Sequence, residues 1–207
     1  YIKWISGQQV GKITFRNPEK FYSAHRQAVN GAGLPEEEGF ERIARYISQK
    51  LKGEQMEQLL KRIIENNEKT VIYTNFLDRG MEPLKLVLYH MGIKPNMYRS
   101  ISGHVKDKQS IINKYNKDPS ILFLLITSAG GEGLDIKPLN RDGTKNGVKN
   151  IIIMDPTWHP TGIKQIIGRG IRFQSHNQGE KVNVYKLLLV CPKTKPEEWE
   201  QDTVSGN

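Results

Sequence analysis

Hydrophobic residues recur along the chain with two spacings, which predict helices and strands in alternation. Apolar positions three and four residues apart predict helices within 56–64, 84–91, 106–117 and 160–172. Short continuous apolar runs predict strands at 70–75, 98–101, 121–126, 149–154 and 181–190. Because strands that alternate with helices form a parallel sheet covered on both faces, the pattern predicts a three-layer α/β fold.

The pattern also predicts how the chain is divided. The alternating elements lie within residues 51–192, which are enough for one hydrophobic core. Residues 1–50 are interpreted as a connector or accessory segment, with one helix at 36–50. Residues 193–207, rich in Lys, Pro and Glu, are expected to be an exposed tail or a link to a further segment. Since the chain starts with Tyr1 and not Met, we expect a part of a larger protein.

Charge favours a polyanionic partner. The chain has 31 Lys and Arg against 22 Asp and Glu, giving a net charge of +9 and a pI of about 9.5. A solvated basic surface would have the same composition. The single cysteine, Cys191, excludes an internal disulfide and fits a reducing compartment. No segment has membrane-spanning length. The five histidines lack the spacing of metal ligands, so we expect no metal site.

A glycine-rich segment follows the predicted strand at 121–126. Residues 127–136 read Thr-Ser-Ala-Gly-Gly-Glu-Gly-Leu-Asp-Ile. Ligand sites of open α/β sheets lie at the carboxyl ends of the strands, where glycines let backbone amides approach a phosphate. The hydroxyls of Thr127 and Ser128 could donate to a phosphodiester. An ordinary glycine-rich turn is the alternative.

A polar stripe marks the predicted helix at 160–172. Gln165, Arg169 and Arg172 are four and three residues apart, which places them on one side of a helix, and the isoleucines lie on the other. Arginine is permanently charged and can donate two parallel hydrogen bonds to a pair of oxygens, so this stripe is suited to binding a chain of phosphates. A basic amphipathic helix without this function would show the same spacing.

Together these segments resemble the second RecA-like lobe of superfamily 2 helicases. Thr127–Ile136 is similar to motif V, Gln165–Arg172 to motif VI and Val71–Phe76 to motif IV. Residues 101–104 and 154–160 resemble further elements of that lobe. Helicases of large cytoplasmic DNA viruses, of the poxvirus and African swine fever virus type, show similar elements in the same order. The resemblance covers residues 54–190 and implies a RecA-like fold.

The resemblance also implies roles for particular residues. Arg172 would be the arginine finger, Arg169 would reach the γ-phosphate beside it, and Gln165 would contact the nucleotide or the attacking water. Gly133 and Asp135 would lie on the ribose side of ATP. The backbone of DNA or RNA would be contacted without sequence preference by Thr127, Ser128, Asn75, Ser102, Gly103 and His104.

The other half of a helicase active site is expected on a first RecA-like lobe. Gly7–Thr14 departs from a P-loop, because its glycines are one residue too close and Ile13 follows the lysine. No Asp-Glu-x-His or Asp-Glu-x-Asp box occurs, so ATP and Mg²⁺ would be bound mainly by the first lobe. We therefore expect a helicase active in full length, with this chain inactive alone. The alternatives are an ATPase subunit of a viral transcription factor or a non-catalytic nucleic-acid-binding scaffold. The expected location is the cytoplasm.

Overall fold

The computed structural model describes residues 53–130, 133–140, 142–144, 146–155, 164–165, 167–168 and 180–187. The predicted connector at 1–50 and the predicted tail at 193–207 lie outside these ranges. Among the described helices, none combines the length and apolar character needed to cross a membrane.

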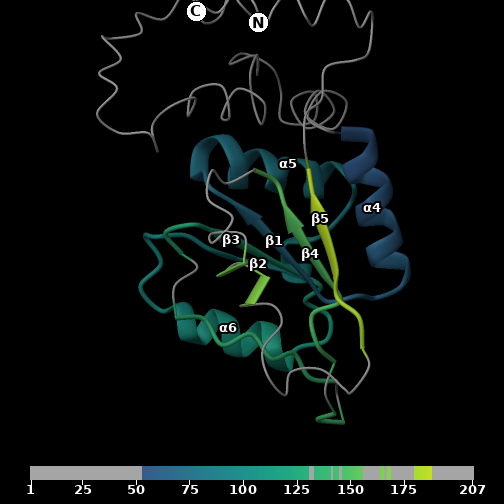
Figure 1. Ribbon diagram of the computed structural model, residues 1–207, viewed down its shortest axis with the longest axis vertical. Helices are drawn as coiled ribbons and strands as arrows, with labels where there is room; N and C mark the ends of the chain where they lie inside the picture. The colour runs from purple at the N-terminus through teal and green to yellow at the C-terminus, as the bar shows by residue number, and fades with distance from the viewer. Residues whose placement is uncertain are drawn as a thin grey trace, which may run out of the picture.

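Helices and strands alternate as the hydrophobic pattern predicts (Figure 1). The helices are α4 (Gly53–Glu65), α5 (Glu82–His90) and α6 (Lys108–Lys117), with a π-helical turn η2 (Leu77–Met81) and a 3₁₀ turn η3 (Pro95–Met97). The strands are β1 (Thr70–Thr74), β2 (Tyr98–Ile101), β3 (Phe123–Thr127), β4 (Asn150–Ile153) and β5 (Asn183–Lys186). Residues 164–165 and 167–168 are also helical.

The strands form one parallel sheet in the order β2-β3-β1-β4-β5. Each neighbouring pair is parallel, so the described sheet confirms the predicted class. Several predicted boundaries were wrong by one or two residues. The strand predicted at 121–126 begins at Phe123 and ends at Thr127, and the helix predicted from 106 begins at Lys108 because the Asp107 side chain caps it through the Ser110 N–H.

Side chains of the central strands alternate between two hydrophobic clusters, one on each face of the sheet. Ile72, Leu125 and Ile152 pack with α4 and α5, whereas Val71, Leu124 and Ile151 pack with α6. Figure 1 shows α6 on the opposite side of the sheet from α4 and α5. Because both faces are covered, β1, β3 and β4 are buried along their whole length.

A fully buried lysine joins the start of β1 to the end of α6. The Lys69 Nζ donates to the carbonyl oxygens of Tyr115 at 2.8 Å, Asp118 at 2.6 Å and Ile121 at 2.6 Å. It also lies 4.5 Å from the centroid of the Tyr115 ring. Burial lowers the pKa of Lys69 to about 8, and the Asp118 carboxylate opposes part of this shift. At neutral pH the ammonium therefore remains mostly charged and satisfies three carbonyls that the protein removes from water.

Replacing this lysine should destabilise the fold in a pH-dependent way. Lys69→Met leaves the three carbonyls without their donor, so the free energy of unfolding at pH 7 should fall by about 2–4 kcal/mol. From pH 8 to 10.5 the unfolded chain retains a proton that the folded chain releases, so the wild type gains stability with rising pH, by up to about 3 kcal/mol. Urea unfolding at several pH values measures the difference, with exposed Lys61→Met as the control. A difference independent of pH would contradict this account.

Candidate nucleic-acid interface at the carboxyl edge of the sheet

The residues predicted to contact phosphates gather where the parallel strands end. Asn75 follows β1, Ser102, Gly103 and His104 follow β2, Thr127 ends β3, and Ser128 comes next. We call these six residues the carboxyl-edge cluster. Because β2, β3 and β1 are adjacent and parallel, their carboxyl ends meet at one edge of the sheet. The structure thus brings together three segments that are distant in sequence.

Direct contacts hold the loop after β3 against both neighbouring loops. On the β1 side, the Ser128 N–H donates to the Thr74 carbonyl oxygen at 3.2 Å, and the Ser128 Oγ lies 3.4 Å from the Asn75 carbonyl oxygen. On the β2 side, Gly130 lies directly on the backbone. A Cβ atom at Gly130 would collide with the Ile101 carbonyl oxygen and would lie 3.0 Å from the Ser102 Cα. Only glycine allows this close approach.

Exposure separates the members of the cluster into two groups. Ser128, Gly103 and His104 are exposed, so their polar groups are accessible to a ligand. Thr127, by contrast, is only 4% exposed, and its Oγ1 accepts a hydrogen bond from the Gly130 N–H at 3.3 Å. The side chain of Thr127 therefore shapes the loop, and Ser128 is the hydroxyl that faces outward.

Asn75 is held from three directions. Its backbone N–H donates to the Asp155 Oδ2 at 2.8 Å, and its side-chain Oδ1 accepts from the Tyr73 hydroxyl at 3.3 Å. Its carbonyl oxygen is the one that faces the Ser128 Oγ. The Asn75 Nδ2 is shielded from solvent and has no hydrogen-bond acceptor among the described residues. The backbone of this loop is therefore fixed, whereas the side-chain amide retains donors.

Asp155 is the residue of this edge that sequence reasoning missed. It is 1% exposed and lies two residues beyond the end of β4. Its Oδ2 accepts from the Thr74 Oγ1 at 2.5 Å and from the Asn75 N–H. One buried carboxylate thus joins the ends of β1 and β4. The available signal was the position of Asp155 directly after the apolar residues 151–154, where a strand ends at the ligand edge.

The residues predicted on the nucleotide side lie apart from the carboxyl-edge cluster. Gly133 is exposed with a φ of +72°, and no atom lies within 4 Å of the position that a Cβ would take. Asp135 is half exposed, its carboxylate lies 3.1 Å from the Lys137 Nζ, and its carbonyl oxygen accepts from the Asn116 Nδ2 at 3.0 Å. Asn116 is in the last turn of α6, whereas Lys108, in the first turn, reaches the Ala129 carbonyl oxygen. About 12 Å of helix therefore separates the two anchor points.

Of the three residues in the predicted polar stripe, the structure describes Gln165. Gln165 is exposed in a helical segment, and Ile167 packs against the hydrophobic cluster on the α6 face of the sheet. This arrangement agrees with the predicted orientation of the helix. Arg169 and Arg172 lie outside the described residues. Within the described ranges, no group of His, Cys, Asp and Glu side chains could hold a metal ion.

The sheet order and its edge define a RecA-like α/β lobe, and comparison with known proteins identifies the family. Residues 51–174 match the helicase conserved C-terminal domain. The chain therefore belongs to this family of superfamily 2 ATP-dependent helicases and translocases.

Three relatives illustrate the similarity. A protein of Acanthamoeba polyphaga mimivirus, assigned as an ATP-dependent RNA helicase, is 37% identical over 145 residues, which are 66% of this chain and 29% of the relative. Nucleoside triphosphatase I of Melanoplus sanguinipes entomopoxvirus is 27% identical over 173 residues, which are 82% of this chain and 24% of the relative. The crystal structure of the C-terminal part of the Fun30 ATPase domain matches with a TM-score of 0.53 and 26% identity, over 68% and 41% of the two chains. The chain thus spans less than a third of the two viral relatives.

The close approach at Gly130 yields a test of the site geometry. Gly130→Ala should lower the free energy of unfolding by about 2 kcal/mol or more, because the new methyl group overlaps backbone that cannot rotate away. Gly168→Ala is the matched control, since its Cβ meets open space in a helical segment and should be neutral or slightly stabilising. Thermal unfolding of both variants measures the difference, and equal stabilities would contradict the described packing.

Proposed function

We propose that this chain is the second lobe of an ATP-driven nucleic-acid translocase or helicase, which grips the backbone of a strand at the carboxyl edge of the sheet. The convergence of Asn75, Ser128 and residues 102–104 at one edge is the observation that carries the proposal. Membership in the helicase C-terminal family supports it. The whole protein would also contain a first RecA-like lobe.

The chemistry of the edge suits phosphate and not base recognition. The Ser128 hydroxyl, the Gly103 backbone N–H and the His104 ring are exposed donors that would contact phosphate oxygens. Such contacts are sequence-independent, because every nucleotide presents the same phosphodiester. The buried carboxylate of Asp155 would act through its two hydrogen bonds by keeping Thr74 and Asn75 in position.

Part of a nucleotide site would lie on this chain. Gly133, the half-exposed Asp135 and the exposed Gln165 would contact one side of ATP. Arg169 and Arg172 would supply positive charge from the opposite side of the cleft to the first lobe. ATP, with Mg²⁺ held mainly by that lobe, would supply the free energy of phosphoryl transfer. Opening and closing of the cleft would then move the grip of this lobe relative to the first.

The similarity to nucleoside triphosphatase I favours a second candidate. In that case the whole protein would hydrolyse nucleoside triphosphates, which is the activity that the name of this relative states, without moving along a strand. Displacement of a labelled strand or of a bound block from a duplex by the two-lobe protein distinguishes the candidates. Displacement that needs ATP indicates a helicase or translocase, whereas ATP consumption without displacement indicates the second candidate.

Strand binding by the carboxyl-edge cluster should depend on salt. Because the net charge of +9 would release counterions from a bound strand, log affinity should fall as log salt concentration rises, with a slope of about −0.7 for each phosphate that a Lys or Arg side chain neutralises. Ser128→Ala and His104→Ala should weaken binding several-fold, whereas His90→Ala, an exposed histidine on α5, should not. Fluorescence anisotropy with two unrelated sequences provides the measurement. Affinity confined to one sequence, or indifferent to salt, would contradict a backbone grip.

Arg172 should be required for hydrolysis in the two-lobe protein. Charge that develops on the transferred phosphoryl group needs a cation from the opposite lobe, and arginine fingers are worth roughly 10³–10⁵ in turnover. Arg172→Ala should therefore abolish ATPase activity and leave strand affinity nearly unchanged, and Arg172→Lys should restore little because it lacks the forked geometry. This chain alone should hydrolyse ATP negligibly. Intact turnover of the Ala variant would falsify the finger assignment, and weaker strand binding would indicate a nucleic-acid-contacting arginine instead.

A further inference from the structure

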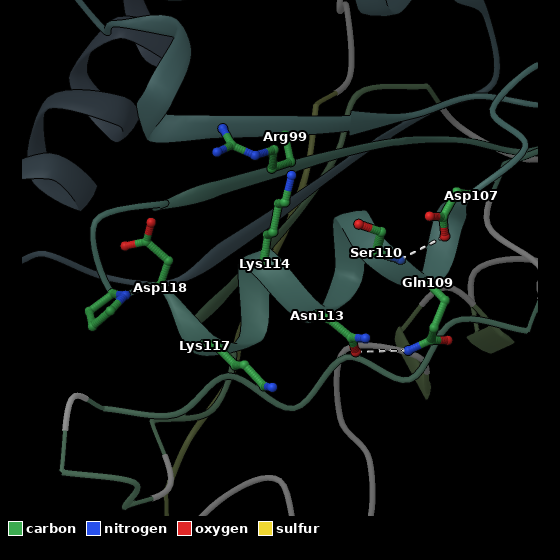
Figure 2. Close-up of a pocket in the computed structure, with 9 residues that line it drawn as sticks. Arg99, Asp107, Gln109, Ser110, Asn113, Lys114, Lys117 and Asp118 are labelled. Atoms are coloured by element: carbon green, nitrogen blue, oxygen red, sulfur yellow. Dashed lines mark hydrogen bonds between the residues drawn. The ribbon is translucent and has the colours of Figure 1, made fainter.

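A polar groove runs along α6 on the outer side of the edge strand β2 (Figure 2). Its volume is about 900 Å³, and its lining extends from Asp107, which caps the start of α6, to Pro119, just beyond its end. Asp107 is three residues after His104, so one end of the groove is continuous with the loop that carries part of the carboxyl-edge cluster. None of the functional assignments above uses this groove.

The groove gathers positive charge from two separate elements. Lys114 and Lys117 come from the last turns of α6, and Arg99 comes from β2. Figure 2 shows the Lys114 side chain directed at Arg99 across the groove. Neither lysine side chain forms an ion pair or a hydrogen bond with a described residue, although the Lys114 carbonyl oxygen accepts from the Asp118 N–H at 2.9 Å. The favourable position of cations at a helix C-terminus explains the two lysines. Arg99 faces Lys114 from the strand, and its Nη1 donates to the carbonyl oxygens of Pro95, Asn96 and Tyr98.

The two carboxylates of the groove have other partners. The Asp107 Oδ1 accepts from the Ser110 N–H at 2.9 Å, and the Asp118 Oδ1 accepts from the Ser120 N–H at 2.9 Å and the Ser120 Oγ at 2.6 Å. These contacts, together with nearby Arg99 and Lys69, hold the pKa of Asp118 below its usual value, the Ser120 hydroxyl making the largest contribution. Both carboxylates therefore serve local turns at the two ends of α6.

Two neutral amide side chains, those of Gln109 and Asn113, also line the groove. The Gln109 Nε2 donates to the Asn113 Oδ1 at 3.0 Å, which orients the two amides one turn apart on α6 (Figure 2). In this geometry the Asn113 oxygen is occupied, so its Nδ2 is the group that remains for a ligand. Hydrogen-bond donors followed by cations along one helix match a chain of phosphate oxygens.

We propose that this groove, the α6 groove, binds the phosphodiester backbone of a single nucleic-acid strand and extends the path that starts at the carboxyl edge. The ten residues of α6 span about 15 Å, which is long enough to follow more than one phosphate of a strand. Phosphates near Lys114 and Arg99 would offset the repulsion between these two cations. The inference rests on the proposed function, because it assumes that a strand is bound at the carboxyl edge.

Charge-neutral variants of the 207-residue chain test the α6 groove. Lys114→Gln/Lys117→Gln should weaken binding of a 15-nucleotide strand about tenfold at low salt and make the salt slope shallower by up to about 1.4, since each lost phosphate contact contributes roughly 0.7. Lys114→Arg/Lys117→Arg keeps the charge and should bind like the wild type. Lys61→Gln/Lys181→Gln removes the same charge from exposed residues on α4 and before β5, away from the groove, and should leave the slope nearly unchanged.

A footprint gives a second measurement that does not depend on variants. Acetylation of Lys114 and Lys117 by a lysine-reactive ester, read by mass spectrometry, should slow several-fold when the strand is added, and acetylation of Lys61 should not. Binding by the double Gln variant equal to that of the Lys61/Lys181 control would overturn the inference. Equal protection of Lys114 and Lys117 from acetylation by polyglutamate of the same charge would also overturn the inference, because the groove would then bind an acidic protein segment.

The variant His104→Ala distinguishes failure of the α6 groove from failure of the proposed function. If the lysine variants bind normally while His104→Ala weakens binding, the α6 groove is wrong and the carboxyl-edge grip stands. If the wild type binds no strand at any salt concentration, both proposals fail.

Discussion

Parallel pairing on both sides of β1 is the constraint on which the rest of this structure depends. The register that pairs Thr74 with Thr127 requires the residues after them, Asn75 and Ser128, to leave the sheet side by side. The pairing of β2 with β3 brings residues 102–104 to the same edge. Since parallel strands cannot be joined by tight turns, each connection must return across a face of the sheet, and this return buries the helices and the core. The ligand edge and the hydrophobic core are therefore consequences of the same pairing.

Two buried charges of opposite sign fix the two ends of this central strand. At the start of β1, the ammonium of Lys69 is surrounded by three carbonyl oxygens. At its end, the carboxylate of Asp155 accepts from the Thr74 hydroxyl and the Asn75 N–H. A buried charge is costly unless hydrogen bonds replace those that it made to water, and in both places they do. Each charge also joins β1 to a different element, α6 for Lys69 and β4 for Asp155, so the strand is held in position along its axis.

The sequence allowed prediction of elements whose signals are local. The runs of Val, Ile and Leu predicted β1, β3 and β4, and the run at 121–126 placed Thr127 and Ser128 at a strand end. Asn75 was assigned through the resemblance of Val71–Phe76 to motif IV. The exposure of Gln165 with Ile167 packed inward agrees with the period of the predicted helix. The sequence could not show which polar residues are buried. In the sequence, Lys69 resembles an ordinary surface lysine before a strand. The three carbonyl oxygens that accept its hydrogen bonds belong to residues 46 to 52 positions away. The inward role of Thr127 was missed for the same reason, since it depends on the path of the loop to Gly130.

α6 connects the carboxyl-edge cluster with the segment at Asp135. Its first turn lies beside the loops of the carboxyl-edge cluster, where Lys108 reaches the Ala129 carbonyl oxygen. Its last turn carries Asn116, which binds the Asp135 carbonyl oxygen and the Lys137 N–H. Lys69 binds the carbonyl oxygens of Tyr115, Asp118 and Ile121 around the end of the helix. Ile112 and Tyr115 are completely buried against the sheet, so the helix cannot slide without disrupting the core. A displacement of the nucleic-acid edge would therefore carry the segment at Asp135 with it as one rigid unit. Under the proposed function, coupling between nucleic acid and nucleotide would need no internal hinge in the described core and would require only movement of the whole lobe against the proposed first lobe.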